Sequence, residues 1–414
     1  MDILRYISIA ISIIFFVCYF HQLVYIPVAL FGKKKKKEYE LKKNDYAVLI
    51  CARNEEKVIG NLIRSIRQQT YDANLIHIFV MADACTDRTA EIALSLGARV
   101  YYRNDPQNVG KGYAMQEMLR HLKEEYPEGF DGYFVFDADN LLKKDYIERM
   151  NETFCQGYDA VTSYRNSKNY GDNWLSAGIG LWFLRESVYL NGARDILGTG
   201  CAVSGTGFLF SRRIAEDLGD WPFHLLTEDV EFSVDCAIKG KKIGYCKDAE
   251  FFDEQPIRFA QSWRQRLRWS KGGFQVIGKY FKQLVKGMFT GNFACYDMAF
   301  AFMPGFVLAV LSVLVNIAIV VWGIVAGSDA LFVLRSLGEM FLSMYGSMFL
   351  IGTITTITEW KRIKTTTFKK IFYNFTFPLY MITFIPIAFW AMFYTPKWKP
   401  IEHTRSIELS EDNE

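Results

Sequence analysis

The chain is organised around the stretch Phe259-Ala-Gln-Ser-Trp-Arg-Gln-Arg-Leu-Arg-Trp-Ser-Lys-Gly-Gly273, which has the pattern of an amphipathic helix. At about 100° per residue, one side of this helix collects apolar residues, namely Phe259, Trp263, Leu267, Phe274, Ile277 and Phe281. Gln265, Arg268 and Trp269 share roughly the opposite side through their i, i+3 and i+4 spacing. One face can therefore lie in a membrane surface while the other presents an amide, a guanidinium and an indole to a site. An ordinary interfacial helix with a solvated polar face explains this stretch equally well.

Long apolar segments lie on both sides of this helix. Half of the 414 residues are hydrophobic, and four runs reach the about 20 residues needed to cross a bilayer: 6–31, 294–326, 332–357 and 371–394. The sequence predicts a transmembrane helix (1–32), an interfacial helix (259–290), three C-terminal membrane segments (291–395) and a tail (396–414). The first run is too long for a secretion signal and lacks a small-residue cleavage site. Pro378 and Pro386 could kink the last run or make it re-entrant.

Basic residues beside these segments predict their orientation. A run of lysines, 33–37, follows the first segment, and Lys279, Lys282 and Lys286 precede the second. The positive-inside rule places both, and the domain between them (33–258), in the cytoplasm. The expected location is a cell membrane crossed several times. Four full crossings would leave both chain ends outside. On the interfacial helix, Arg264, Arg266 and Lys271 suit lipid headgroups.

Composition excludes other classes of protein. The net charge of +3 argues against a nucleic-acid binder, because the excess of Lys and Arg is local. The eight cysteines form no CxxC pair and no His lies at zinc-ligand spacing, so reduced thiols are expected rather than disulfides or a zinc site. Nothing in the composition defines the oligomeric state.

The domain between the membrane segments alternates short apolar runs with helical patterns. Residues 46–52, 76–82 and 132–136 read as strands, with helices near 89–96 and 113–126 between them. This alternation predicts a parallel sheet covered on both faces. Polar residues follow the strands at 53–56, at Asp83 and at 137–139, and ligands of open α/β sheets bind at these strand ends.

Three short motifs could carry chemistry, although each has an ordinary structural explanation. Asp137 and Asp139 share one face if the chain is extended there, and paired carboxylates suit Mg²⁺ or Mn²⁺ holding phosphate oxygens; a solvated turn is the alternative. Lys111 lies in a Gly-flanked loop near a helix start, as a diphosphate requires, or in a plain turn. Thr227, Glu228 and Asp229 open a helix, where capping and dipole effects would also favour them.

Taken together, Asp83, the Asp137/Asp139 pair, Thr227-Glu228-Asp229 and Gln265-Arg-Leu-Arg-Trp269 resemble the signature of processive family 2 glycosyltransferases. Those enzymes include the cellulose, chitin, hyaluronan and poly-N-acetylglucosamine synthases. The resemblance covers about residues 45 to 280, with 35 residues between Asp229 and Gln265. It implies a GT-A fold, a Rossmann-like nucleotide-sugar-binding α/β domain, docked on the bilayer by amphipathic helices.

The resemblance also implies roles for the matching residues. Ala52, Arg53, Glu55 and Asp83 would hold the uridine, and Lys111 the phosphates. Asp139, with Asp137, would bind the metal, which is expected to be Mg²⁺ or Mn²⁺. Asp229, in the motif with Thr227 and Glu228, would be the general base that deprotonates the acceptor. Gln265, Arg268 and Trp269 would line the site where acceptor and leaving diphosphate meet.

The function that follows is an inverting enzyme that uses a UDP-sugar to extend a β-linked polysaccharide and passes it through its own membrane segments. A non-processive enzyme with a lipid acceptor is the first alternative, and a catalytically inactive partner subunit is the second. Residues 396–405 are loosely similar to the gating loops of such synthases, although their sequence departs from the usual motif. An interfacial tail is the other interpretation of those residues. Which sugar is transferred cannot be read from the sequence.

Overall fold

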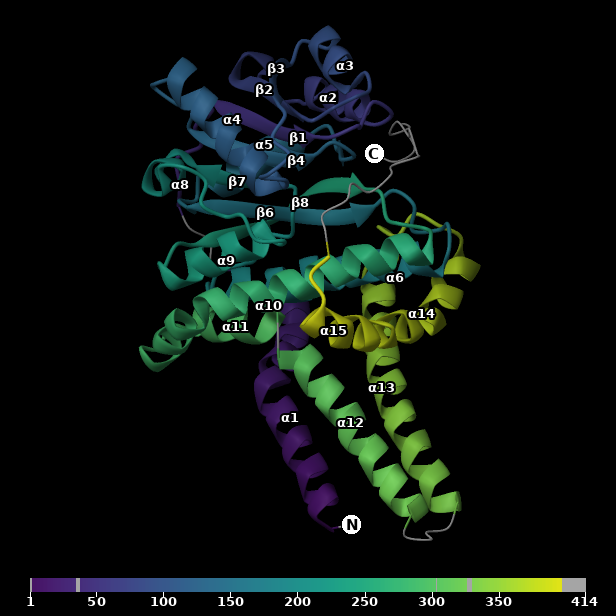
Figure 1. Cartoon of the computed structure of the whole chain (residues 1–414). Coiled ribbons are helices and arrows are strands. Elements are labelled where there is room, and N and C mark those ends of the chain that lie inside the picture. Colours follow the sequence, from purple (N-terminus) through teal and green to yellow (C-terminus); the bar gives the residue numbers. More distant parts are fainter. Residues whose placement is uncertain (1, 35–37, 303, 326–329, 397–414) are drawn as a thin grey trace.

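A mixed sheet of eight strands forms the centre of the large upper domain (Figure 1). The computed structural model describes residues 2–34, 38–302, 304–325 and 330–396. The strand order is β3-β2-β1-β4-β7-β6-β8-β5. The strands are Tyr46–Ala52 (β1), Ile76–Asp83 (β2), Arg99–Arg103 (β3), Gly132–Asp137 (β4), Leu141–Leu142 (β5), Ala160–Ser167 (β6), Phe208–Ser211 (β7) and Ile243–Asp253 (β8).

Strands β3, β2, β1 and β4 run parallel, so their carboxyl ends meet at one edge. Strand β7 is antiparallel to both β4 and β6. Six of the seven residues of β1 are buried, which explains its continuous apolar sequence, because a strand covered on both faces has no polar side. The predicted strands and the helices between them are confirmed.

Helices cover both faces of the sheet. One face carries α2 (Ile59–Arg67), α3 (Thr89–Ser95) and α5 (Tyr146–Phe154). The other carries α4 (Lys111–Glu125), α6 (Trp174–Arg185) and α9 (Glu228–Ile238). The remaining short elements of this domain are η1 (Ala73–Leu75), η2 (Glu186–Asn191, a π-helix), α7 (Gly192–Leu197) and α8 (Arg212–Leu218).

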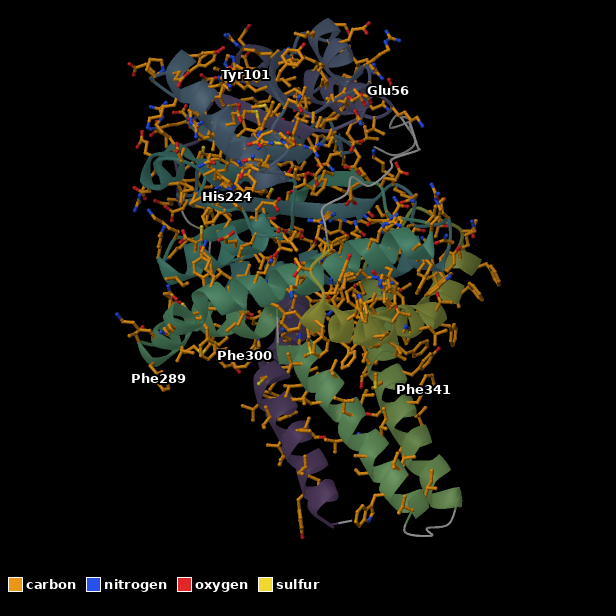
Figure 2. All side chains as sticks on the ribbon, viewed as in Figure 1. Glu56, Tyr101, His224, Phe289, Phe300 and Phe341 are labelled. Atoms are coloured by element: carbon orange, nitrogen blue, oxygen red, sulfur yellow. The ribbon has the colours of Figure 1, made fainter. Side chains whose placement is uncertain are left out.

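Below the sheet, four helices lie across the molecule, and three long helices extend away from them side by side (Figure 1). The crossing layer consists of α10 (Phe259–Phe289), α11 (Phe293–Phe302), α14 (Thr367–Ile382) and α15 (Phe384–Phe393). The long helices are α1 (Asp2–Phe31), α12 (Pro304–Val325) and α13 (Ala330–Thr358). Figure 2 shows mostly carbon side chains on the long helices, and Phe341 on α13 is half exposed.

Two of the four predicted membrane runs are divided in the structure. Run 294–326 is shared between α11, which belongs to the crossing layer, and α12. Run 371–394 is shared between α14 and α15, which meet at Thr383 and also lie across (Figure 1). By length and composition, Ile9–Phe31, Phe341–Thr358 and Thr367–Phe393 could each cross a membrane, whereas Val310–Val325 is a shorter apolar helix.

The apolar face of α10 packs mainly on protein rather than facing lipid directly. Leu267 is buried with Ile387 and Ala391 of α15, and Trp263 and Phe274 pack against this group. The predicted placement of one basic residue on this helix, Arg266, among lipid headgroups is therefore wrong.

Arg266 is fully buried beneath α14 and α15. Its Nη1 donates to Thr383 Oγ1 at 2.5 Å, and its guanidinium lies 4.5 Å from the centre of the Tyr380 ring. Apolar helices that come more than a hundred residues later in the chain cover this side chain.

A buried polar cluster joins α1 to the sheet domain. Asp297 of α11 is fully buried and accepts hydrogen bonds from Arg194 Nε of α7 at 2.6 Å and from Tyr25 of α1 at 2.8 Å. The ring of His21 on α1 lies 3.2 Å from the same carboxylate. Because a buried carboxylate needs its charge compensated, this cluster fixes where α1 meets the domain.

Candidate active site

The loops after β1 and β2 hold the predicted nucleotide-binding residues together. Arg53 donates from Nη2 to Asp83 Oδ2 at 2.7 Å, and Arg103 of β3 donates from Nη1 to Asp83 Oδ1 at 2.8 Å. Ala52, at the end of β1, is buried, and its carbonyl accepts from Cys85 Sγ. Asp83 is thus clamped between two arginines at the carboxyl ends of three strands.

The backbone of these loops is strained. Asn54 has φ 58° and Ala84 has φ 51°, in the left-handed region that non-glycine residues rarely occupy. Asn54 Oδ1 accepts the backbone N–H of Thr86 at 2.8 Å, and the N–H of Glu55 donates to Thr89 Oγ1 at 2.8 Å. Such strain clusters at ligand sites, which agrees with the predicted position of the nucleotide.

Lys111, at the start of α4, joins two parts of the site. Its ammonium donates to Asp137 Oδ1 at 2.5 Å and to the carbonyl of Gly205 at 2.7 Å. The next residue, Gly112, must lack a side chain, because a Cβ there would lie 1.9 Å from the carbonyl oxygen of Phe223. The start of α4 is therefore held close to the loop that precedes α9.

Asp139 lies just beyond Asp137, but the chain between them is not extended as the sequence interpretation required. A turn forms, in which the N–H of Asn140 donates to the carbonyl of Asp137 at 3.0 Å. Asp139 is buried, and its Oδ2 accepts the N–H of Glu254, after β8, at 2.8 Å. The two residues are therefore joined by a turn, not by the alternation of a strand.

Thr227, Glu228 and Asp229 begin α9 at the opposite side of Lys111. A Cβ on Gly205 would lie 3.8 Å from Asp229 Oδ2, so this carboxylate lies beside the same loop that Lys111 contacts. Thr227 occupies the N-cap position without a capping hydrogen bond, and its Oγ1 is buried without a partner. An orphaned hydroxyl is costly in a folded protein, which points to a role other than capping.

The central helix, α10, forms the floor under this motif. Arg268 Nη1 donates to the carbonyl of Leu226 at 2.9 Å. A Cβ on Gly272 would lie 2.4 Å from Thr227 Oγ1, so α10 and the start of α9 are in direct contact. Trp269 packs on Phe183 of α6 with a ring-centre separation of 5.8 Å, and Gln265 Oε1 is buried without a partner.

These groups share one electrostatic environment. Burial raises the pKa of the Cys51 thiol at the end of β1 to about 12, and the charges that act on it are those of Lys111, Asp83, Asp137 and Glu228. Burial, reinforced by the neighbouring Asp229, raises the pKa of Glu228 to about 7. Burial also raises the pKa of Asp229, while the cations of Arg268 and Lys111 oppose the rise.

The donor set fits a divalent cation that is completed by its substrate. Among the described residues, no three His, Cys, Asp or Glu side chains converge into a ready-made metal cage. Asp137 and Asp139 offer carboxylates from one turn of the chain, and Mg²⁺ usually takes one or two carboxylates together with substrate phosphates. All eight cysteines are free, as predicted.

Three basic residues at the site escaped the sequence reasoning. Arg103 ends β3, so the rule that polar residues follow strands could have found it. Arg165 lies inside β6, bonds Asp253 at 2.9 Å and covers the Phe183 ring at 3.6 Å; a charge within a buried strand was its only signal. Lys168 donates to the carbonyl of Asp139, which no local pattern indicates.

A doubly covered sheet with acidic side chains at its strand ends, and a facing helix that begins with two carboxylates, is the architecture of a GT-A glycosyltransferase. Residues 44–272, more than half of the chain, match the model of the family described as "Glycosyltransferase like family 2". The chain belongs to this family and is a glycosyltransferase.

Known proteins similar to this chain make glycolipids or polysaccharides. A β-monoglucosyldiacylglycerol synthase of Synechocystis sp. is 24% identical over 241 residues, covering 57% of this chain and 49% of that protein. A poly-β-1,6-N-acetyl-D-glucosamine synthase of Staphylococcus aureus is 25% identical over 264 residues, covering 61% of this chain and 59% of that protein. The chain therefore spans about half or somewhat more of these curated relatives.

One solved structure is similar over nearly the whole chain. The mannosyltransferase PcManGT from Pyrobaculum calidifontis, in complex with GDP-Man and Mn²⁺, has a TM-score of 0.62 and 16% sequence identity. The match covers 94% of this chain and 99% of that one. At this identity the likeness establishes the GT-A-like fold.

Proposed function

We propose that this chain is a membrane-bound, inverting glycosyltransferase that takes a sugar from a UDP-sugar and extends a β-linked polysaccharide. The observation that carries the chemistry is that the charges of Lys111 and Arg268 both act on Asp229. Lys111 and Asp229 lie at the Gly205 loop, and Arg268 contacts the loop before α9 at Leu226. A base, an ammonium for the donor phosphates and a guanidinium then surround one point. Direct attack by an acceptor hydroxyl there inverts the anomeric carbon, so an α-linked donor gives a β-linked product.

Each predicted residue has a role in this proposal. Ala52, Arg53, Glu55 and Asp83 hold the nucleoside at the ends of β1 and β2. Lys111 neutralises the diphosphate, where charge develops as the bond to the sugar breaks.

On the acceptor side, Asp229 removes the proton from the hydroxyl, for which it must come within hydrogen-bond reach. Glu228 and Thr227 shape its surroundings. Gln265, Arg268 and Trp269 form the acceptor side of the site.

The proposal includes a divalent cation, Mg²⁺ or Mn²⁺, held by Asp139 and Asp137. When bound, the cation supplies positive charge to the leaving diphosphate. The presence of Mn²⁺ in the PcManGT complex supports this part of the proposal. Removal of divalent ions with EDTA is expected to abolish transfer, with recovery on addition of Mg²⁺ or Mn²⁺.

A lipid acceptor is the second candidate, and the membrane part of the fold favours it. The four crossing helices form a layer below the site (Figure 1), and Phe289 on α10 is 90% exposed. A lipid headgroup at that surface could reach the site from the side. The similarity to a glucosyldiacylglycerol synthase supports this candidate, whereas the similarity to a poly-N-acetylglucosamine synthase supports polymerisation and translocation.

The product decides between the candidates. Full-length protein in nanodiscs would be given radiolabelled UDP-glucose, UDP-N-acetylglucosamine, UDP-glucuronate or GDP-mannose, with release of the nucleotide measured in parallel. A size ladder supports polymerisation, and a single lipid-soluble spot supports a lipid acceptor. No release from any donor would favour the inactive partner subunit, and release from GDP-mannose alone would contradict the assignment of a UDP-sugar.

The proposed topology has the catalytic domain in the cytoplasm and three crossings, by α1, α12 and α13. Helices α14 and α15 lie in the plane of α10, not parallel to α12 and α13 (Figure 1), which supports a position at the membrane surface. An odd number of crossings puts the chain after α15 on the catalytic side. The gating prediction for residues 396–405 falls mostly on 397–414, outside the described residues.

A further inference from the structure

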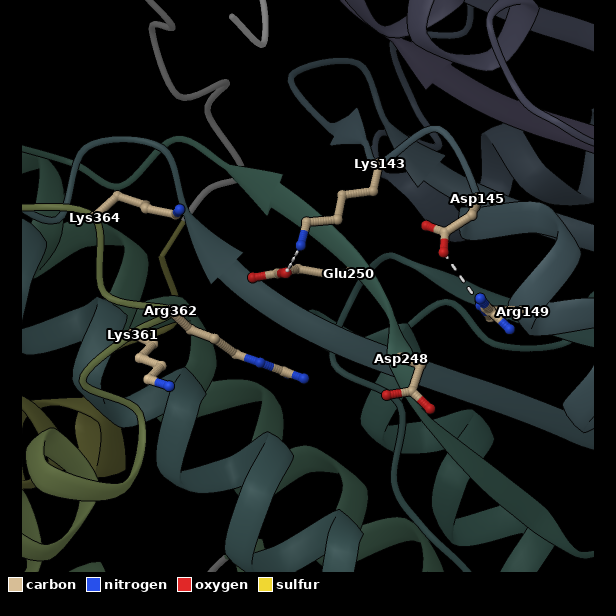
Figure 3. Close-up of a pocket in the computed structure, with 8 residues that line it drawn as sticks. All are labelled: Lys143, Asp145, Arg149, Asp248, Glu250, Lys361, Arg362 and Lys364. Carbon is tan, nitrogen blue, oxygen red and sulfur yellow. Dashed lines mark hydrogen bonds and ion pairs between the residues drawn. The ribbon is translucent and has the colours of Figure 1, made fainter. Parts of the chain in front are cut away.

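A polar cleft lies between the edge of the sheet and the connection from α13 to α14, away from the loops at the ends of β1, β2 and β4. Figure 3 shows its lining residues, and its volume is about 450 Å³. The sheet side contributes Lys143, Asp145, Arg149, Asp248 and Glu250, and the membrane side contributes Lys361, Arg362 and Lys364. The cleft thus joins the two halves of the molecule.

The charges of the cleft do not balance. Five basic and three acidic residues line it. Two of the acids are already paired, Glu250 with Lys143 at 2.6 Å and Asp145 with Arg149 at 3.1 Å. The membrane-side connection adds three cations, of which Arg362 also feels the charges of Glu250 and Glu359. Lys361 and Lys364 leave the open part of the cleft with an excess of positive charge, which favours an anion.

Arg362 is held in place without using a carboxylate hydrogen bond. Its guanidinium lies 4.0 Å from the centre of the Tyr164 ring, and its Nη1 donates to the carbonyl of Lys247 at 3.3 Å. Its own carbonyl accepts from Asn166 Nδ2 at 3.0 Å. A planar donor fixed in this way loses little side-chain entropy when it binds an oxyanion. Lys361 and Lys364 are exposed beside it.

We propose that this cleft binds a phosphate group through Arg362, Lys361 and Lys364. A guanidinium with two ammonium groups matches the several charged oxygens of a phosphate. The positive-inside rule accounts for lysines near a membrane helix, but not for their convergence with Lys143 of the sheet domain on one cleft. The phosphate can belong to a lipid headgroup, since α13 ends here, or to a soluble phosphate ester.

The cleft is connected to the predicted metal-binding turn by short stretches of chain. The N–H of Lys143 donates to the carbonyl of Glu250 at 3.2 Å, where β5 pairs with β8. At the other end of this pairing, the N–H of Glu254 donates to Asp139 at 2.8 Å. The cleft and Asp139 are therefore linked through one short stretch of chain, 250–254.

The soluble source is tested with inorganic phosphate by titration calorimetry, using full-length protein in a phosphorus-free maltoside without divalent ions. The variant combines Lys361→Gln and Lys364→Gln, which remove exposed charges and leave the packed Arg362 in place. Phosphate binding is expected to weaken at least tenfold. Lys123→Gln, which changes an exposed lysine on α4, is expected to leave it unchanged.

The lipid source is tested in nanodiscs of phosphatidylcholine with or without phosphatidylglycerol. Amine acetylation followed by peptide mass spectrometry reads each lysine. Several-fold protection of Lys361 and Lys364 by phosphatidylglycerol, with Lys123 unaffected and exposed Lys282 of α10 less protected, assigns the phosphate to a headgroup. A positive result in either arm supports the proposal and identifies the source. Phosphate binding that survives the double substitution, together with equal acetylation in both lipids, overturns it. Neither readout depends on transferase activity.

Discussion

Glu228 and Asp229 are neighbouring carboxylates at the start of α9, with one cation on each side. Lys111 of α4 and Arg268 of α10 lower their pKa values, whereas burial raises them. Glu186 of η2 adds a third negative charge near Asp229. Burial, with the repulsion of Asp229 on Glu228, therefore makes this pair easier to protonate than free carboxyls.

This arrangement predicts an acid limb in the rate of transfer. A raised carboxyl pKa means that the protonated form persists to higher pH, so the base is lost as the pH falls through that pKa. Activity is expected to fall as the pH is lowered, and to fall at a higher pH than a free carboxyl would give, because burial raises the pKa of the base Asp229. In Glu228→Gln the limb should move to lower pH, because Asp229 no longer shares its site with a second negative charge. Nucleotide release between pH 5 and 9 measures both profiles, and an unchanged midpoint in the variant contradicts the coupling.

Asp229 itself is predicted to be needed for turnover and not for binding of the donor. Asp229→Asn keeps the size of the side chain and removes the base, for which a loss of about 10²–10⁴-fold is expected. UDP affinity, measured by calorimetry, should stay within about twofold, because Asp83 and Lys111 are untouched. Undiminished turnover would remove Asp229 from the role of base.

Site residues could be predicted from the sequence where a local structural rule applies. Asp83 and Asp137 were found because polar residues at strand ends converge in a parallel sheet, and in the structure the charges of both act on Cys51 at the end of β1. Arg266 was misplaced because its partners on α14 lie 114 positions away. No periodicity within one helix can show that a later helix will cover it.

At the scale of elements, α10 packs so closely on the start of α9 that Gly272 has no room for a side chain. Gly272→Ala is expected to force Thr227 and the start of α9 to move, since the new Cβ would lie 2.4 Å from Thr227 Oγ1. Overpacking of this kind costs about 1–3 kcal/mol. The thermal midpoint should fall, and nucleotide release should drop at least tenfold.

Gly278 of the same helix is the matched control for that experiment. Nothing lies within 4 Å of a Cβ built there, so Gly278→Ala should be neutral or stabilise the helix by about 0.5–1 kcal/mol. Equal effects of the two substitutions would show that Gly272 matters only as a helical glycine, not as a contact with the motif.

The lengths of apolar runs identified the membrane-associated elements but not their directions. Run 294–326 reads as one continuous segment, yet the structure assigns its first part to α11, whose Asp297 is buried against Arg194. Whether an apolar helix crosses a membrane or lies along its surface depends on which elements cover it. Helix α11 is covered by α9 and α10. The strands of the sheet could be predicted more directly, because each one is a short apolar run that ends in polar residues.

For the molecule as a whole, the three crossings proposed above, in place of four, would reverse the predicted side of the C-terminal tail. A green fluorescent protein fused to the C-terminus should fluoresce, and an alkaline phosphatase at the same point should be inactive, because that end then lies in the cytoplasm. An alkaline phosphatase fused to the N-terminus should be active, because that end lies outside in the proposed topology. An active C-terminal phosphatase would restore the fourth crossing by α14 and α15.

Helix α10 contacts Thr227 on one side and α15 on the other, so removing α10 would expose both surfaces. A water-soluble fragment ending at residue 258 would keep its nucleotide loops but lose the floor beneath Thr227. Chimaeras that exchange membrane parts between relatives should place their junctions outside α10 and α15. The two packed helices then come from the same parent protein.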